Sequence, residues 1–178
     1  MYPEASRRPG VRYKGDYKEM KVIGVFLSVV LLAGALCAAE LASKKALTLE
    51  IARQIAAAGE SHAVKNGWKV AIAIVDEGGY LLYFERMVGA PLSAVDLANR
   101  KARTAAIFGR PSKAYNERIR QGETGVVAIP GVLPFEGGLP ITHEGQVLGA
   151  IGVSGVTSQQ DGMVAQAGVD ALPKILGK

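Results

Sequence analysis

The stretch EGGLPITHEGQVLGAIGVSG, residues 136–155, decides the fold because it sets strand-forming Val, Ile and Leu beside six glycines. Glu144-Gly145 at its centre is a turn signal, and the segments on either side alternate as strands do. We therefore expect a β-hairpin with strands over 139–143 and 146–153. Glycine weakens a strand by about 0.5–1 kcal/mol relative to alanine, so the glycines in this hairpin need a reason.

The three glycines toward the end of the stretch have a spacing that invites a dinucleotide-binding interpretation. Gly149, Gly152 and Gly155 form GxxGxxG, whereas the dinucleotide fingerprint is GxGxxG, and no Lys-Ser or Lys-Thr follows to make a phosphate-binding P-loop. We expect Gly149 and Gly152 to thin a strand so that other backbone can pack closely against it.

The two ends of the stretch are the parts that could touch a ligand. Gly137 and Gly138 give the backbone before Pro140 conformational freedom. Gly155 comes just before a helix that Thr157 can cap, and free backbone N–H groups at a helix start can hold a carboxylate or phosphate. Simple turn formation explains Gly155 equally well, and the sequence leaves both interpretations open.

The rest of the chain predicts one α+β domain. Apolar residues spaced three or four apart predict helices, and a second strand pair surrounds the turn signal at 76–79. Strands that pair through hairpins form an antiparallel sheet, against which the helices pack. We expect helices over 49–66, 94–108, 113–120 and from 158 until Pro173 interrupts, strands over 68–76 and 80–86, and a short strand at 126–129.

Hydroxyl residues mark the starts of these helices. Thr48 and Ser112 are candidate N-caps for the first and third helices. Ser93 with Asp96, and Thr157 with Gln160, have the spacing of capping boxes, in which the two side chains satisfy each other's backbone N–H groups.

Composition excludes several classes of protein. The chain has 178 residues, 49% of them apolar and 21% charged, which suits a folded domain with a real core. The net charge is +5, but residues 1–39 hold six Lys and Arg against three Asp and Glu. The remaining chain carries fifteen Lys and Arg against thirteen Asp and Glu, and it has no run of basic residues with interleaved aromatic residues. We therefore expect no nucleic-acid partner.

Residues 20–39, MKVIGVFLSVVLLAGALCAA, are typical of a signal peptide. Lys21 precedes an uncharged apolar stretch that ends in small residues at cleavage spacing. The alternative is an uncleaved membrane anchor, because 18 apolar residues lie near the lower limit for spanning a bilayer. We expect translation to begin naturally at Met20, with residues 1–19 as an extension, and the protein to be exported. Cleavage after Ala39 would remove Cys37, the single cysteine.

Four side chains stand out as candidates for chemistry. His62 falls on the apolar stripe of the first helix, where a histidine is either a core residue or a ligand. Lys101 falls on the stripe of the second helix, where it either extends to solvent along the helix edge or lines a pocket for an acidic ligand. His143 lies beside the hairpin turn, where we expect it to be solvated. Ser154 has no base partner and no GxSxG motif, which argues against a Ser-His-Asp hydrolase.

Three blocks of sequence together resemble the GlcG/HbpS family, the "haem-degrading" domain also found at the C-terminus of PduO-type corrinoid adenosyltransferases. They are AIAIVDEGGYLLYFERM, ANRKARTAAIFGRPS and EGGLPITHEGQVLGAIGVSGVTSQQD, in the order that the family shows. The resemblance covers about residues 47–172, and we assign the domain to 47–176. It implies a five-stranded antiparallel sheet flanked by helices, assembly into dimers or higher oligomers, and binding of haem or a corrinoid by some members.

The leading hypothesis from the sequence is an exported, oligomeric haem-binding or tetrapyrrole-binding protein. Its pocket would lie between the first helix and the glycine-rich hairpin, with His62 as iron ligand, and with Lys101 and the helix start at Gly155–Thr157 meeting acidic groups. The alternatives are an enzyme or binding protein for a small carboxylate, and a structural assembly module. The candidate ligand-binding residues are His62, Lys101, Gly137, Gly138, Pro140, Ser154, Gly155 and Thr157.

Overall fold

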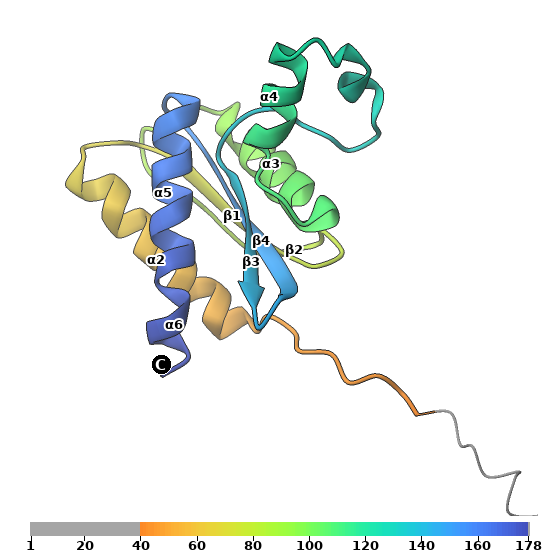
Figure 1. Cartoon of the computed structure of the whole chain (residues 1–178). Coiled ribbons are helices and arrows are strands. Elements are labelled where there is room, and N and C mark those ends of the chain that lie inside the picture. The colour runs from red at the N-terminus through yellow and green to blue at the C-terminus, as the bar shows by residue number, and fades with distance from the viewer. Residues whose placement is uncertain (1–39, 178) are drawn as a thin grey trace, which may run out of the picture. The chain divides into compact units, whose positions relative to one another are not determined.

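The computed structural model describes residues 40–177, and Lys44–Lys178 forms one compact unit (Figure 1). Within the described part, no helix is long and apolar enough to cross a membrane. The predicted signal segment and the extension before it lie outside the described residues. The elements are, in order, α2 (Leu49–Lys65), β1 (Ala71–Asp76), β2 (Leu81–Arg86), α3 (Ala94–Phe108), α4 (Lys113–Arg120), the 3-10 helix η1 (Thr124–Ala128), β3 (Gly138–His143), β4 (Gln146–Ser154), α5 (Ser158–Asp170) and α6 (Leu172–Ile175).

The strands form one antiparallel sheet in the order β2-β1-β4-β3. Both predicted hairpins are present, and the central pair β1–β4 joins them with Ile72 opposite Val153. At the turn of the second hairpin, Glu144 and Gly145 both adopt positive φ angles, 51° and 79°, which match the right-handed twist of the flanking strands. The prediction of an α+β fold with an antiparallel sheet is confirmed.

The predicted strand count was wrong. The described residues contain four strands, and the segment predicted as a short strand at 126–129 lies in and just after η1. Its surroundings explain the difference, because Gly125, Pro130, Gly131 and Pro134 interrupt the chain at short intervals. Glycine and proline both disfavour a paired strand, and a tight helical turn needs no partner.

Helices cover both faces of the sheet (Figure 1). Alternate residues of β1 point to opposite faces, so Ile72 and Ile74 pack toward α2 and α5, whereas Ala71 and Ala73 pack toward α3. The stripe predicted for α2 is buried as expected, at Ala52, Ile55, Ala56, Gly59 and Ala63. The resulting core contains mostly Ala, Val, Ile and Leu.

The glycines of β4 let neighbouring backbone come close, as predicted. A Cβ atom at Gly152 would overlap the carbonyl oxygen of Ala98 and the amide nitrogen of Ala102 in α3. A Cβ atom at Gly149 would overlap the carbonyl oxygen of Val75 in the neighbouring strand. Close packing, and not ligand binding, is therefore the role of these two residues.

Two of the four predicted helix caps are present. The Thr48 side chain accepts a hydrogen bond from the Ile51 amide, and Thr157 with Gln160 forms a complete capping box. Ser93 and Ser112 make no such bond, so these two predictions were wrong. Both residues already have helical backbone angles, and a cap requires the extended conformation that Thr48 and Thr157 adopt.

Candidate functional site

A buried ion pair joins α3 to α5 at the end of β4. The Lys101 ammonium lies 2.8 Å from Asp161 Oδ2 and 3.0 Å from the carbonyl oxygen of Val153. Lys101 is 3% exposed and Asp161 2% exposed. The sequence left open whether Lys101 extends to solvent or lines a pocket. The structure rules out extension to solvent, because the ammonium is held inside by Asp161.

The backbone at the start of α5 also holds the Asp161 carboxylate. Its Oδ1 accepts a hydrogen bond from the Val156 amide at 3.2 Å, and the Gly155 amide contributes as well. Burial raises the pKa of Asp161 above its ordinary value, and the contacts with Lys101 and the two amides oppose that rise. Removing one partner of such a pair costs about 3–5 kcal/mol, because the other charge stays buried without compensation.

A cavity of about 260 Å³ opens beside this ion pair, and we name it the Ser154 cavity. Ser154 is 5% exposed, and its hydroxyl has no hydrogen-bond partner among residues 40–177. The cavity combines polar and apolar side chains from α3, β4, α5 and the loop before β3. Its lining residues are Leu97, Lys101, Phe135, Ser154, Val156, Ser158 and Asp161.

Gly137 and Gly138 belong to the wall around the ion pair. A Cβ atom at Gly137 would lie 2.9 Å from the Lys101 ammonium nitrogen, and one at Gly138 would overlap the Lys101 carbonyl oxygen. Gly137 is needed because a Cβ atom there would lie 2.6 Å from the Val153 carbonyl oxygen of β4, and Gly138 because the backbone of α3 passes so close to the start of β3. Pro140 lies further along β3, paired with Ala150, and does not line the Ser154 cavity.

The helix start at Gly155–Thr157 differs from the expected anion cradle. The Val156 amide is bound to Asp161, and the Thr157 amide donates to Gln160 Oε1 at 3.1 Å. The chain's own side chains therefore occupy the amides that were expected to hold an external anion. Gly155 has a φ angle of 154°, and a Cβ atom there would overlap the Lys69 carbonyl oxygen. Close backbone packing thus accounts for Gly155.

The two histidines lie in different places. His62 is half-buried near the end of α2, with its ring centroid 5.9 Å from that of Trp68. It lines neither the Ser154 cavity nor the cavity at His143 described next. Neither of these two cavities therefore brings His62 and Lys101 together.

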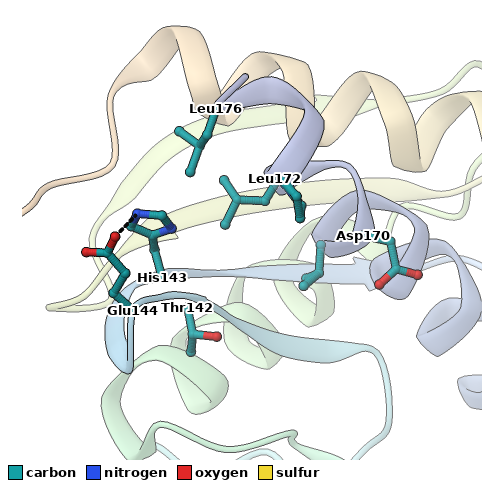
Figure 2. Close-up of a pocket in the computed structure, with 8 residues that line it drawn as sticks. Thr142, His143, Glu144, Asp170, Leu172 and Leu176 are labelled. Atoms are coloured by element: carbon teal, nitrogen blue, oxygen red, sulfur yellow. Dashed lines mark ion pairs between the residues drawn. The ribbon is translucent and has the colours of Figure 1, made fainter. Parts of the chain in front are cut away.

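His143 lines a cavity of about 350 Å³ between the turn end of the β3–β4 hairpin and α5–α6, and we name it the His143 cavity. The side chain is only 18% exposed, so the expectation that it is solvated was wrong. Figure 2 shows the imidazole directed toward Leu172 and Leu176, with the Glu144 carboxylate 3.4 Å from Nε2. The other lining residues are Thr142, Val169, Asp170 and Pro173.

No metal centre is preformed in the described part of the chain. Between residues 40 and 177, no three His, Cys, Asp or Glu side chains gather in a way that could hold a metal ion.

The sequence matches a known family over most of this domain. The family model for the haem-degrading protein HbpS-like matches residues 47–170. The chain belongs to the HbpS-like family. This confirms the resemblance that the three sequence blocks indicated.

Individual relatives agree with this assignment. Protein GlcG of Escherichia coli strain K12 is 42% identical over 112 residues, which are 63% of this chain and 84% of GlcG. The crystal structure of a double mutant of HbpS from Streptomyces reticuli is 36% identical with a TM-score of 0.70, covering 78% of this chain and 97% of that chain. The crystal structure of a PduOC:haem complex is 27% identical with a TM-score of 0.66, and the match covers 71% of this chain and 95% of that chain.

Two features of the HbpS-like domain were missed from the sequence. Asp161 was not recognised as the partner of Lys101, although it lies on the buried stripe of α5 with Val164, Ala165 and Gly168. A charged residue on such a stripe is the signal that could have found it. The His143 cavity left no signal, because its walls come from segments that meet only in the folded chain.

Proposed function

We propose that this HbpS-like protein binds haem or a related tetrapyrrole. The PduOC:haem complex, a structural neighbour at a TM-score of 0.66, supports this proposal. The observation that carries it in this chain is the imidazole of His143 in a mostly apolar cavity. Haem sites commonly combine a histidine ligand with an apolar surface that faces the porphyrin.

The His143 cavity fits one part of a haem. Val169, Leu172 and Leu176 provide an apolar wall, and the imidazole provides a nitrogen donor. A volume of about 350 Å³ is at the small end for ligand pockets, so a tetrapyrrole would be held by one face or edge. Glu144 and Asp170 lie at the rim and would repel propionates, which would therefore point to solvent.

His62 remains the alternative ligand. It is half-buried beside Trp68, whose indole ring could lie along a porphyrin. Lys101, expected from the sequence to meet an acidic group, keeps its contacts with Asp161 and Val153 and has one further N–H for that role. A corrinoid could occupy the same place as haem, because both are flat tetrapyrroles with an axial coordination position.

A titration with hemin tests the proposal. The protein should develop a Soret band that saturates at a defined stoichiometry, and His143→Ala should shift or abolish it. His62→Ala is the matched variant, because it removes the other histidine and leaves the His143 cavity intact. A spectrum that changes only in His62→Ala would transfer the ligand role to His62. Failure of the wild-type protein to bind hemin would overturn the proposal, and a parallel titration with cobalamin tests the corrinoid.

We also propose that the protein is exported and works as a homo-oligomer, in haem or iron handling or sensing. The signal-like residues 20–39 support export, and the resemblance to the family supports assembly. Mass spectrometry of protein from the native host should find a chain that begins near Glu40. Light scattering should find a particle of at least two chains. A monomer that begins at Met1 or Met20 would contradict both points.

A further inference from the structure

The Ser154 cavity presents more hydrogen-bond donors than the protein itself uses. Ser154 is buried, and its hydroxyl has no partner among the described residues. Lys101 directs two N–H groups to Val153 and Asp161, and an ammonium has three. Ser158, the first residue of α5, adds a hydroxyl and a backbone N–H that no described residue accepts.

The Asp161 carboxylate, the charged acceptor in this cavity, already accepts from the protein at both of its oxygens. Asp161 uses Oδ1 for the Val156 amide and Oδ2 for Lys101. The Ser154 and Ser158 hydroxyls face the open cavity, where water accepts from them while no ligand is bound. A ligand that satisfies them must therefore bring acceptor atoms of its own.

The remaining wall sets the size and shape of that ligand. Leu97, Phe135 and Val156 add apolar surface to the lining. A volume of about 260 Å³ exceeds the ~150 Å³ of a cavity that holds benzene, so it admits a small molecule of about ten heavy atoms or fewer. The formal charges of Lys101 and Asp161 cancel each other. The free hydrogen-bond donors and the positive N-terminal end of the α5 dipole therefore favour a negatively charged ligand.

We propose that the Ser154 cavity binds a small carboxylate that carries a short apolar group. The carboxylate oxygens accept from the Ser154 hydroxyl, the third N–H of Lys101 and Ser158, which follows the occupied amides of Val156 and Thr157, and the apolar group packs on Phe135 and Leu97. This site is separate from the His143 cavity and does not depend on haem binding. The buried ion pair acts as the fixed framework of the site, since it holds α3, α5 and the end of β4 together.

Calorimetric titration of the full chain with butyrate tests this proposal. Butyramide and butylamine are matched probes, because they keep the apolar group and replace the carboxylate with a neutral or cationic head. We expect butyrate to bind best and butylamine not to bind. Ser154→Ala should weaken butyrate binding by about three- to ten-fold, which corresponds to the loss of one hydrogen bond.

Two further variants make the test decisive. Ser158→Ala removes a donor at the more exposed side of the cavity, so it reports on the site even where Ser154→Ala impairs folding. Ser93→Ala removes an exposed hydroxyl that makes no capping bond, and it should leave butyrate affinity unchanged. The proposal is overturned by absence of butyrate binding, by equal binding of butylamine, or by unchanged affinity in both cavity variants. A hemin titration that is normal in Ser154→Ala would show that the two sites are independent.

Discussion

At the scale of single residues, the most informative feature is a pair of charges on two apolar stripes. Lys101 was recognisable from the sequence because its neighbours on α3, Ala98, Ala102 and Ala105, predict a buried face. Asp161 could have been recognised in the same way on α5. The sequence could not show that the two stripes meet, because the residues are 60 positions apart and contact depends on the whole sheet.

Glu85 offers a test of electrostatics in the folded chain. It lies on β2, where the Tyr83 hydroxyl donates to Oε2 at 2.7 Å, and Oε1 is shielded without a partner. Burial raises the pKa of Glu85, and the nearby Glu60 carboxylate raises it further, whereas the Tyr83 hydrogen bond opposes the rise. The folded state therefore holds a proton on Glu85 at a pH where the unfolded chain has lost it.

We predict that Glu85→Gln changes how stability depends on pH. A carboxyl whose folded pKa is raised contributes stability below its unfolded pKa of about 4.3, and this is lost as the pH rises through the folded pKa. The wild type should therefore lose free energy of unfolding across that window, and Glu85→Gln should lose less. Urea denaturation at a series of pH values from acid to neutral measures the difference.

The amide can add a constant offset, so the slope against pH is the quantity to compare. Glu117→Gln, an exposed carboxyl on α4, is the matched control and should keep the wild-type slope. Equal slopes for wild type and Glu85→Gln would contradict the prediction.

At the scale of elements, helix starts show where sequence patterns are ambiguous. Ser93-x-x-Asp96 and Thr157-x-x-Gln160 both have the capping-box spacing, yet only the second forms a box. The chain before α3 is already turning, since the Ala94 amide donates to the Pro91 carbonyl. Ser93 consequently has helical angles, φ −61° and ψ −24°, and cannot act as a cap. The pattern identifies the position of the helix, and the preceding turn decides the cap.

The contact between α3 and β4 gives an element-scale prediction. The sequence predicted a close contact at Gly152, and the structure identifies the backbone of Ala98 and Ala102 as the partner. Gly152→Ala should destabilise the protein by about 1–3 kcal/mol or more, because neither backbone can move without shifting α3. The midpoint of urea denaturation should fall accordingly.

Gly125→Ala is the control for this substitution. A Cβ atom at Gly125 meets no atom within 4 Å, and its backbone is not in the left-handed region. The free energy of unfolding of Gly125→Ala should stay within about 0.5 kcal/mol of the wild-type value. A Gly152→Ala protein as stable as Gly125→Ala would show that α3 does not pack on β4 as described.

At the scale of the whole molecule, the sequence indicated the fold class, and the positions of the cavities emerged only from the structure. Hairpins and stripes are local patterns, so they predicted an antiparallel sheet with helices on it. The fifth strand was expected from the sequence pattern at 126–129 and from the family resemblance, and the chain there, interrupted by glycines and prolines, forms η1 instead. The Ser154 cavity depends on α3 and α5 meeting at the end of β4, and the His143 cavity on α5 and α6 reaching the hairpin turn, and no local pattern records either contact. The pocket predicted between α2 and the hairpin stays a prediction, and the structure adds the His143 cavity against α5 and α6.

The last prediction concerns the independence of the domain. Every buried residue of the three apolar clusters in the described chain lies between Leu47 and Leu172. A protein that begins at Glu40 should therefore unfold in a single transition, with the same midpoint and the same urea dependence as the full chain. Urea denaturation followed by circular dichroism compares the two proteins. Titrations of the shortened protein with hemin and with butyrate should also match those of the full chain, because both cavities are lined by residues from Leu97 onward. A lower midpoint in the shortened protein would mean that residues 1–39 stabilise the fold, which would contradict their assignment as an extension and a removable signal peptide.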